Sequence, residues 1–235
     1  SPTEIIHIAQ IEELPIIEVL RRLKAAGMDS LPGGGAEILD DEIRNRISPF
    51  KNSTDEWLDV MRAAHQLGMR SSATMVFGFQ ETSEHLLMHL DRLRSLQDET
   101  GGFTAFITWS YQPEHTERGG REATGVEYLR TLALARLVLD NFDNLQVSYV
   151  TQGPKLAQVA LRFGANDFGS LMIEENVVSA TGIDFIMPEA EICRIIEDAG
   201  FRPARRYQDY NLEQPGDGGC PCCRTNRSQL VGSGM

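Results

Sequence analysis

The sequence predicts an α/β protein whose strands pair in one parallel sheet. Strand-like segments alternate with helical segments of about 10–16 residues, which is typical of βα units. Hydrophobic residues make up 41% of the chain and charged residues 24%, so a packed core is possible. Right-handed crossovers leave an open doubly wound sheet or a barrel, and roughly four or five units are too few for an eightfold barrel.

The predicted helices show apolar residues at helical spacing between recognisable start and stop signals. The first covers residues 4–26 and is followed by Gly27 as a stop signal. In the second, residues 53–67, Ser53 or Thr54 can cap the first turn, where the carboxylates of Asp55 and Glu56 suit the helix dipole. The remaining predicted helices cover residues 83–97, 125–139, 154–163 and 188–199.

The predicted strands are short apolar or β-branched runs between these helices. They cover residues 30–32, 71–77, 103–109 and 145–149, with a short piece at 167–168 and a last extended piece at 202–210. Ser72 and Thr74 alternate with apolar residues, so they point into a barrel lumen or are satisfied by neighbouring backbone. Residues 1–212 are predicted to form one domain, and the Gly-, Pro- and Ser-rich residues 213–235 a flexible tail with cysteines.

Charge and hydropathy limit the expected partners. The formal net charge is -12. Such an acidic surface repels phosphate backbones and anionic membranes, so neither nucleic acid nor a membrane is an expected partner. The sequence shows no signal peptide and no run of about 18 apolar residues. We expect a soluble cytoplasmic protein.

The cysteine and histidine spacings do not indicate a metal site. Cys193 lies in a helical pattern and is expected to be a small buried hydrophobe. The thiols at positions 220, 222 and 223 could bind a soft metal with one outside ligand, but a redox-exposed tail is the favoured interpretation. His85 and His89 lie on one helical face, which we expect to be exposed to solvent.

Candidate site residues follow the carboxyl ends of the predicted strands, where parallel sheets carry function. Gly34 and Gly35 let the backbone approach a ligand, and Glu37 could accept hydrogen bonds from ribose hydroxyls or an ammonium. The alternative is a plain turn with Glu37 solvated. The loop is neither a P-loop nor a dinucleotide-binding fingerprint, because the required lysine and glycine spacings are missing.

Two further strand ends carry polar groups. Tyr111 and Gln112 place an aromatic ring beside an amide, which suits a flat ring in a pocket, although a rim tyrosine is equally compatible. His115 could be an acid or a base, but a lone loop histidine is more often solvated. Glu174 or Glu175 could act as a general base or bind a substrate hydroxyl, or the pair could be solvated at a helix start. The sequence contains no Gly-x-Ser-x-Gly elbow, so it does not indicate a serine hydrolase.

Taken together, four regions resemble the radical S-adenosylmethionine enzymes of the futalosine route to menaquinone. The regions are residues 16–39 with Leu-Pro-Gly-Gly-Gly-Ala-Glu-Ile-Leu, residues 73–78, residues 101–116, and residues 164–182 ending in Glu-Glu-Asn-Val-Val-Ser-Ala-Thr-Gly. Their order and spacing carry the resemblance, which extends to about Tyr210. The Thr-Trp-Ser-Tyr-Gln run at residues 108–112 favours the branch that cyclises dehypoxanthine futalosine over the aminofutalosine and deazaflavin-precursor branches.

This resemblance implies a partial (βα) TIM-like barrel of the radical SAM type that lacks the first strands. It also implies S-adenosylmethionine and a [4Fe–4S] cluster, which together generate a 5′-deoxyadenosyl radical that removes a ribose hydrogen from dehypoxanthine futalosine. By this analogy the cofactor contacts are Gly34, Gly35, Glu37, Ser72 and Thr74, and the substrate contacts are Tyr111, Gln112, Asn166 and Glu174.

One feature of that family is missing from the sequence. The Cys-x3-Cys-x2-Cys loop that holds the cluster does not occur, so its ligands are expected upstream of Ser1. We therefore expect the carboxyl-terminal portion of an enzyme, inactive by itself. The alternative is a non-catalytic barrel remnant that acts as a binding or assembly protein. The sequence does not indicate the electron donor.

Overall fold

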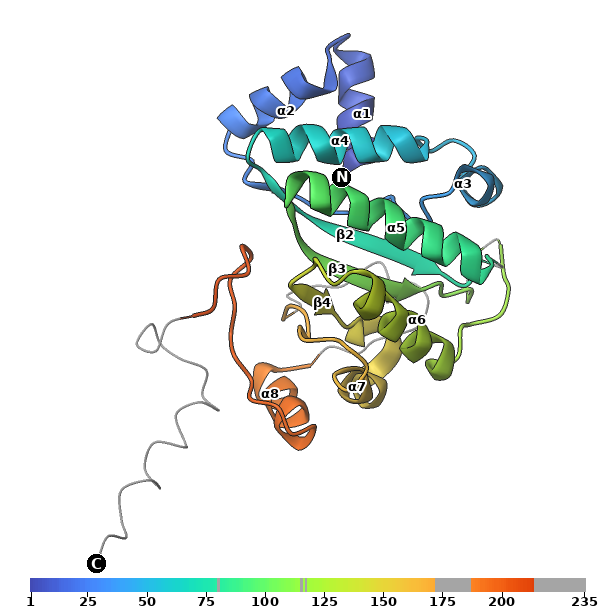
Figure 1. Ribbon diagram of the computed structural model, residues 1–235, viewed down its shortest axis with the longest axis vertical. Coiled ribbons are helices and arrows are strands. Elements are labelled where there is room, and N and C mark those ends of the chain that lie inside the picture. The colour runs from blue at the N-terminus through green and yellow to red at the C-terminus, as the bar shows by residue number, and fades with distance from the viewer. Residues whose placement is uncertain (80, 115, 117, 172–186, 214–235) are drawn as a thin grey trace, which may run out of the picture.

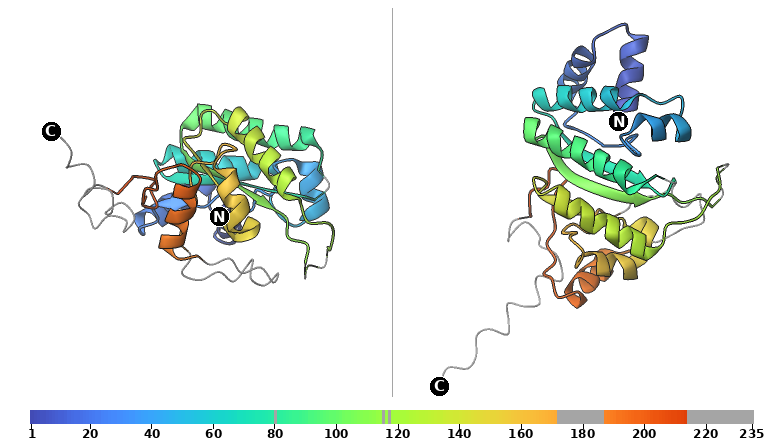
Figure 2. Two further views of the ribbon diagram at one scale, coloured as in Figure 1. Left: turned by 90° about the horizontal axis from the view of Figure 1, so that it is seen from below. Right: turned by 45° about the vertical axis from the view of Figure 1, so that its right-hand side comes forward.

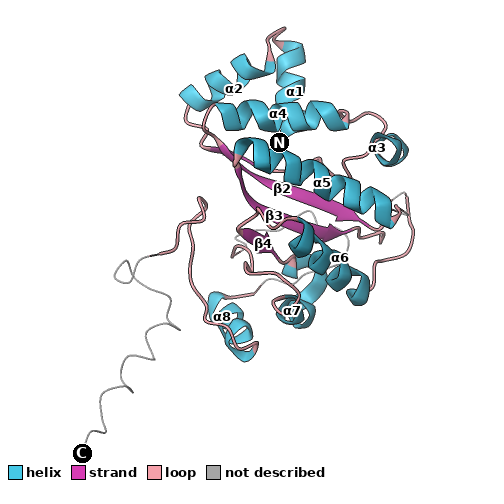
Figure 3. Ribbon diagram, viewed as in Figure 1, coloured by secondary structure: helices cyan, strands magenta, loops and turns pink. Residues whose placement is uncertain are grey.

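The fold is built on one parallel β-sheet. The computed structural model describes residues 1–79, 81–114, 116, 118–171 and 187–213. The sheet has the order β1 (Ser30–Leu31), β2 (Arg70–Phe77), β3 (Phe103–Ser110) and β4 (Asn144–Gln146). All three pairings are parallel, and Figure 3 shows β2, β3 and β4 side by side, so the carboxyl ends of the strands share one edge. This confirms the predicted α/β class with a parallel sheet.

Helices precede, separate and follow the strands. The described helices are α1 (Pro2–Ile11), α2 (Ile16–Ala25), α3 (Asp41–Ile47), α4 (Thr54–Gln66), α5 (Ser83–Thr100), α6 (Gly125–Val138), α7 (Tyr149–Ala160) and α8 (Glu189–Asp198). Capping boxes begin α4, α5 and α6 at Ser53, Thr82 and Thr124. Gly101 ends α5 with a left-handed φ of 59°.

The two faces of the sheet are covered differently. Helices α4 and α5 pack on β2, α6 and α7 pack on β3, and α1 and α2 pack on the outer side of α4 (Figure 1). The right-hand view of Figure 2 shows α8 next to α7, at the opposite end of the molecule from α1 and α2. The face away from these helices carries side chains that stay half-buried, namely Ser72, Thr74, Val76, Ile107 and Trp109.

The amino-terminal helical region differs from its prediction. Residues 4–26 form two helices rather than one, because Glu13 turns the chain with φ 52° and Pro15 caps α2. The short helix α3 was not predicted. Its start is set by Asp40, whose carboxylate accepts hydrogen bonds from the backbone N–H groups of Glu42 and Ile43.

The last strands are shorter than predicted. Strand β4 ends at Gln146, and Tyr149 already belongs to α7. Gly153, with φ 75°, separates the first turn of α7 from the part that begins at Pro154. Residues 167–168 and 202–210 contribute isolated bridges rather than strands, from Asp167 to Gln146 and from Arg206 to Leu212.

Two further expectations concern burial and the chain end. Cys193 is buried in α8, as predicted. The predicted tail lies almost entirely outside the described residues, which end at Glu213. Within the described part, no helix is both long and apolar enough to cross a membrane.

Candidate functional site

The glycine segment after β1 is fastened to β2. Gly33 N donates to Ser72 Oγ at 3.0 Å, and Thr74 Oγ1 donates to the Gly33 carbonyl oxygen at 2.6 Å. A Cβ atom on Gly33 would lie 2.6 Å from the Ser72 carbonyl oxygen, so the close approach requires glycine. Both hydroxyls thus hydrogen-bond neighbouring backbone from the half-buried face of the sheet, and their contacts to a cofactor stay a prediction.

A buried arginine holds the next part of this segment. Arg44 of α3 is 3% exposed, and its guanidinium donates to the carbonyl oxygens of Gly35 at 3.2 Å, Ala36 at 2.5 Å and Asn52 at 2.7 Å. Burial lowers the pKa of Arg44 from its ordinary value, and the nearby Glu37 carboxylate opposes that shift. The sequence pattern did not single out Arg44, because arginines are rarely buried.

Glu37 lies between two cations instead of being solvated. Its Oε2 is 3.7 Å from Arg44 Nη1, and Lys51 Nζ donates to its Oε1. The Glu37 backbone adopts φ 40°, a left-handed conformation that is uncommon outside glycine, and its carbonyl oxygen accepts from Val76 N at 2.9 Å. The carboxylate, 15% exposed, is therefore held in one place and largely neutralised.

Two histidines were either misplaced or missed by the sequence analysis. The prediction that His89 faces solvent is wrong: it is fully buried, and its Nδ1 accepts from Leu39 N at 2.9 Å. Burial lowers the pKa of His89 to about 3 and that of His65 to about 4. His65 hydrogen-bonds Thr100 and Ser71. Both rings are neutral structural groups.

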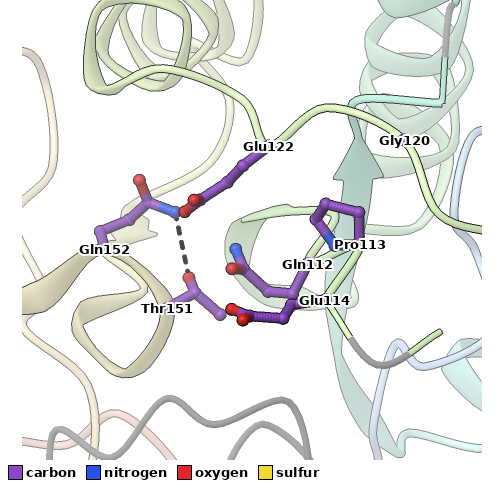
Figure 4. Close-up of a pocket in the computed structure, with 7 residues that line it drawn as sticks. All are labelled: Gln112, Pro113, Glu114, Gly120, Glu122, Thr151 and Gln152. Carbon is purple, nitrogen blue, oxygen red and sulfur yellow. Dashed lines mark hydrogen bonds between the residues drawn. The ribbon is translucent and has the colours of Figure 1, made fainter.

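A cavity of about 540 Å³ opens at the carboxyl ends of β3 and β4 (Figure 4). Two parts of the chain provide its wall: the connection between β3 and α6, and the first turn of α7. The lining residues are Gln112, Pro113, Glu114, Gly120, Glu122, Thr151 and Gln152. Gln112 is thus the one predicted substrate contact among the described residues that lines this cavity.

A buried hydroxyl network lies behind the two glutamines. Ser110, 3% exposed, accepts hydrogen bonds at its Oγ from Gln112 Nε2 at 2.9 Å and Gln152 Nε2 at 2.5 Å. Gln152 Nε2 also donates to Thr151 Oγ1 at 3.2 Å, and Thr151 Oγ1 lies 2.7 Å from Ser148 Oγ. The sequence includes Ser110 in the run at residues 108–112 but does not reveal its role, because its two amide partners come from different segments.

The other predicted substrate contacts lie elsewhere. The Tyr111 hydroxyl is 2.6 Å from Thr116 Oγ1, and its ring is tilted against that of Phe79 with 4.5 Å between the ring centroids, so Tyr111 supports the loop beside the cavity. The Asn166 amide is used at the amino end of β4, where Oδ1 accepts from Leu145 N at 2.8 Å and Nδ2 donates to the Asp143 carbonyl oxygen at 2.9 Å.

Two candidates lie outside the described residues. They are Glu174, a predicted substrate contact, and His115, the candidate acid or base. Contacts from Tyr111, Asn166 and Glu174 to a substrate therefore stay predictions, as do contacts from the glycine segment to a cofactor.

Two family models match adjoining parts of the chain. The radical SAM superfamily matches residues 3–93, and the CofH/MqnC C-terminal region matches residues 100–217. The chain belongs to the CofH/MqnC family of radical SAM proteins. Membership confirms the resemblance drawn from the sequence, and with it the partial barrel of the radical SAM type.

Named relatives of this radical SAM family member cover nearly all of it. A cyclic dehypoxanthine futalosine synthase from Halalkalibacterium halodurans is 46% identical over 90% of this chain and 58% of its own length. Another from Streptomyces coelicolor is 44% identical over 88% of this chain and 52% of its own length. An aminodeoxyfutalosine synthase from Thermus thermophilus is 45% identical over 89% of this chain and 58% of its own length. The chain thus spans little more than half the length of these relatives.

Proposed function

We propose that this chain is the carboxyl-terminal portion of a cytoplasmic radical SAM enzyme that cyclises dehypoxanthine futalosine in menaquinone biosynthesis. The supporting observation is the 46% and 44% identity to two cyclic dehypoxanthine futalosine synthases. A polar cavity at the carboxyl edge of the sheet, where βα folds place their chemistry, agrees with this function.

The glycine segment fits part of the cofactor that this function requires. S-adenosylmethionine supplies the hydrogen-abstracting radical in this chemistry. It carries an ammonium group and ribose hydroxyls, and a carboxylate can accept hydrogen bonds from both. Glu37 offers such a carboxylate next to the half-buried Gly34 and Gly35. Gly34 is held by Trp57, whose Nε1 donates to the Gly34 carbonyl oxygen at 3.3 Å. Glu37 is therefore the proposed cofactor contact with the best chemical support.

The described residues do not fit the iron–sulfur cluster. Such clusters need several thiolates, whereas the described part contains the buried Cys193 and no group of three His, Cys, Asp or Glu side chains able to hold a metal ion. We therefore assign no step that involves the cluster to these residues. The cluster ligands are proposed to lie in the portion of the enzyme that the relatives possess in addition.

At the substrate end, Gln112 is the proposed contact that the geometry supports best, because its side chain lines the cavity. Tyr111 supports the same loop, while the Asn166 amide is already committed to the start of β4. The 45% identity to an aminodeoxyfutalosine synthase supports a second candidate function, since it is nearly as high.

The test uses this chain extended at its amino end to the length of its relatives, reconstituted anaerobically with iron, sulfide and S-adenosylmethionine. We expect dehypoxanthine futalosine to be converted to its cyclic product with release of 5′-deoxyadenosine. Gln112→Leu should lower kcat/KM about tenfold, the loss of one hydrogen bond, while Ser95→Ala on the exposed side of α5 should change nothing. Formation of aminodeoxyfutalosine by the extended enzyme would instead favour the second candidate.

A further inference from the structure

The cavity at the carboxyl ends of β3 and β4 has carboxylates but no cation in its described lining. Glu114 and Glu122 supply the carboxylates, and neither forms an ion pair with any described residue. The neighbouring Arg121 is turned toward α6, where it donates to Glu127 Oε1 at 2.7 Å and Oε2 at 2.8 Å. That pairing lowers the pKa of Glu127 to about 2 and leaves the charge of Glu122 uncompensated.

The two amides in the wall have already used their donors. Gln112 Nε2 donates to the hydroxyl of Ser110 at 2.9 Å and to its carbonyl oxygen at 3.2 Å. Gln152 Nε2 donates to Ser110 Oγ at 2.5 Å and to Thr151 Oγ1 at 3.2 Å. A primary amide has two N–H hydrogens, so both groups are exhausted within the protein. Each side chain then has only its carbonyl oxygen to offer a ligand.

We propose that this cavity binds an uncharged, hydroxyl-rich part of the substrate, with Gln152 as a second contact and Ser110 as the positioning residue for both amides. Amide and carboxylate oxygens together form a wall of acceptors, which is complementary to sugar hydroxyls. An anionic group would meet two carboxylates without a compensating cation in the described lining, so the cavity disfavours it. The inference rests on the proposed function only in assigning the substrate to this edge of the sheet.

A cationic ligand suits the cavity less well than a sugar. The described lining holds no aromatic ring to stack on an organic cation, and the described residues contain no group of three acidic or metal-binding side chains for an ion. The volume of about 540 Å³ also exceeds what a single ion needs and accommodates a pentose with its substituents.

The experiment measures binding to this chain alone, by the side-chain amide signals of Gln112 and Gln152 in 15N–1H spectra. The two signals are assigned from Gln112→Leu and Gln152→Leu, and the probes are methyl β-D-ribofuranoside, benzoate and ethylammonium. We expect the ribofuranoside to shift both signals saturably and the two ions to leave them unchanged. Ser110→Ala should weaken binding of the ribofuranoside about tenfold, and Ser95→Ala should leave that binding unchanged.

A charge-reversing variant separates recognition from simple structural damage. Gln152→Lys places a cation in the wall, so it should lose the ribofuranoside and gain benzoate, an exchange that misfolding cannot produce. Backbone signals of each variant confirm that it is folded. Three outcomes would each overturn the proposal. They are shifts caused by benzoate or ethylammonium in the unaltered chain, full ribofuranoside binding by folded Ser110→Ala, and no shift with any probe. Because no turnover is needed, failure of the cyclisation assay leaves this result interpretable.

Discussion

Two strand ends of this sheet look alike in sequence but differ in how their polar groups are used. In residues 33–39, the backbone N–H and carbonyl groups form hydrogen bonds with four side chains, those of Ser72, Thr74, Arg44 and His89. We call this segment the closed end, because its backbone groups are satisfied within the protein. Beside β3 and β4, two carboxylates and two amide oxygens are left facing a cavity. At the first strand end the backbone groups are therefore used within the protein and the Glu37 carboxylate is the proposed ligand contact, whereas at the second the acceptors face a cavity.

The largest effect on stability should come from removing a side chain that holds the closed end, residues 33–39. Arg44→Met should lower the free energy of unfolding by about 3 kcal/mol, because three buried carbonyl oxygens lose a charged donor. Urea titration of the chain measures this change. Arg22→Met is the matched control, since Arg22 is 61% exposed and pairs with Glu18 on the surface, and it should cost no more than about 0.5 kcal/mol. Equal losses in the two variants would contradict the closed arrangement.

A smaller effect should appear as pH dependence. The pKa of His89 is about 3 in the folded chain and 6.5 ordinarily, so between these values the unfolded state binds more protons. Stability should fall as the pH drops through this window, by about 2 kcal/mol between pH 7.5 and pH 5 from His89 alone. His65, with a pKa of about 4, contributes in the same direction.

Replacing the ring isolates this contribution. His89→Gln keeps an acceptor for Leu39 N but cannot be protonated, so the difference between urea midpoints at the two pH values should shrink. The exposed His7→Gln should leave that difference unchanged. An unaltered pH profile in His89→Gln would show that His89 is not held neutral.

The smallest effect on stability should come from the open end. Gln112→Ala should change the free energy of unfolding by only about 0.5 kcal/mol, because Ser110 Oγ still accepts from Gln152 and the vacated space faces the cavity. The same urea titration checks it. A loss as large as that of Arg44→Met would mean that the glutamine supports the fold and that the two strand ends do not differ.

The order of elements could be predicted from the sequence, because caps, glycines and apolar spacing are local signals. Ser53, one of two candidate caps, begins α4, and strands β2 and β3 lie within a residue of their predicted bounds. Tertiary contacts decided what was missed. His89 looked like a surface residue by its own helix, but Leu39, which lies fifty residues earlier, supplies the partner that makes its burial possible.

The candidate site was only partly predictable for the same reason. Gln112 could be found because it follows a strand end directly. Gln152 could not be assigned a role in the same way, since the sequence does not show that it shares Ser110 with Gln112. Arg44 was missed because nothing in a seven-residue helix reveals which side chain turns inward.

The bend at Gly153 affects how this site can evolve. Gly153 takes a non-helical φ of 75° between the turn that carries Thr151 and Gln152 and the helix that begins at Pro154. The four residues 149–152 are thus a separate structural unit, anchored by the buried Tyr149. In the proposed site, substitutions at Thr151 or Gln152 would change ligand preference without altering the helix behind them, so relatives with different substrates could diverge here while sharing one scaffold.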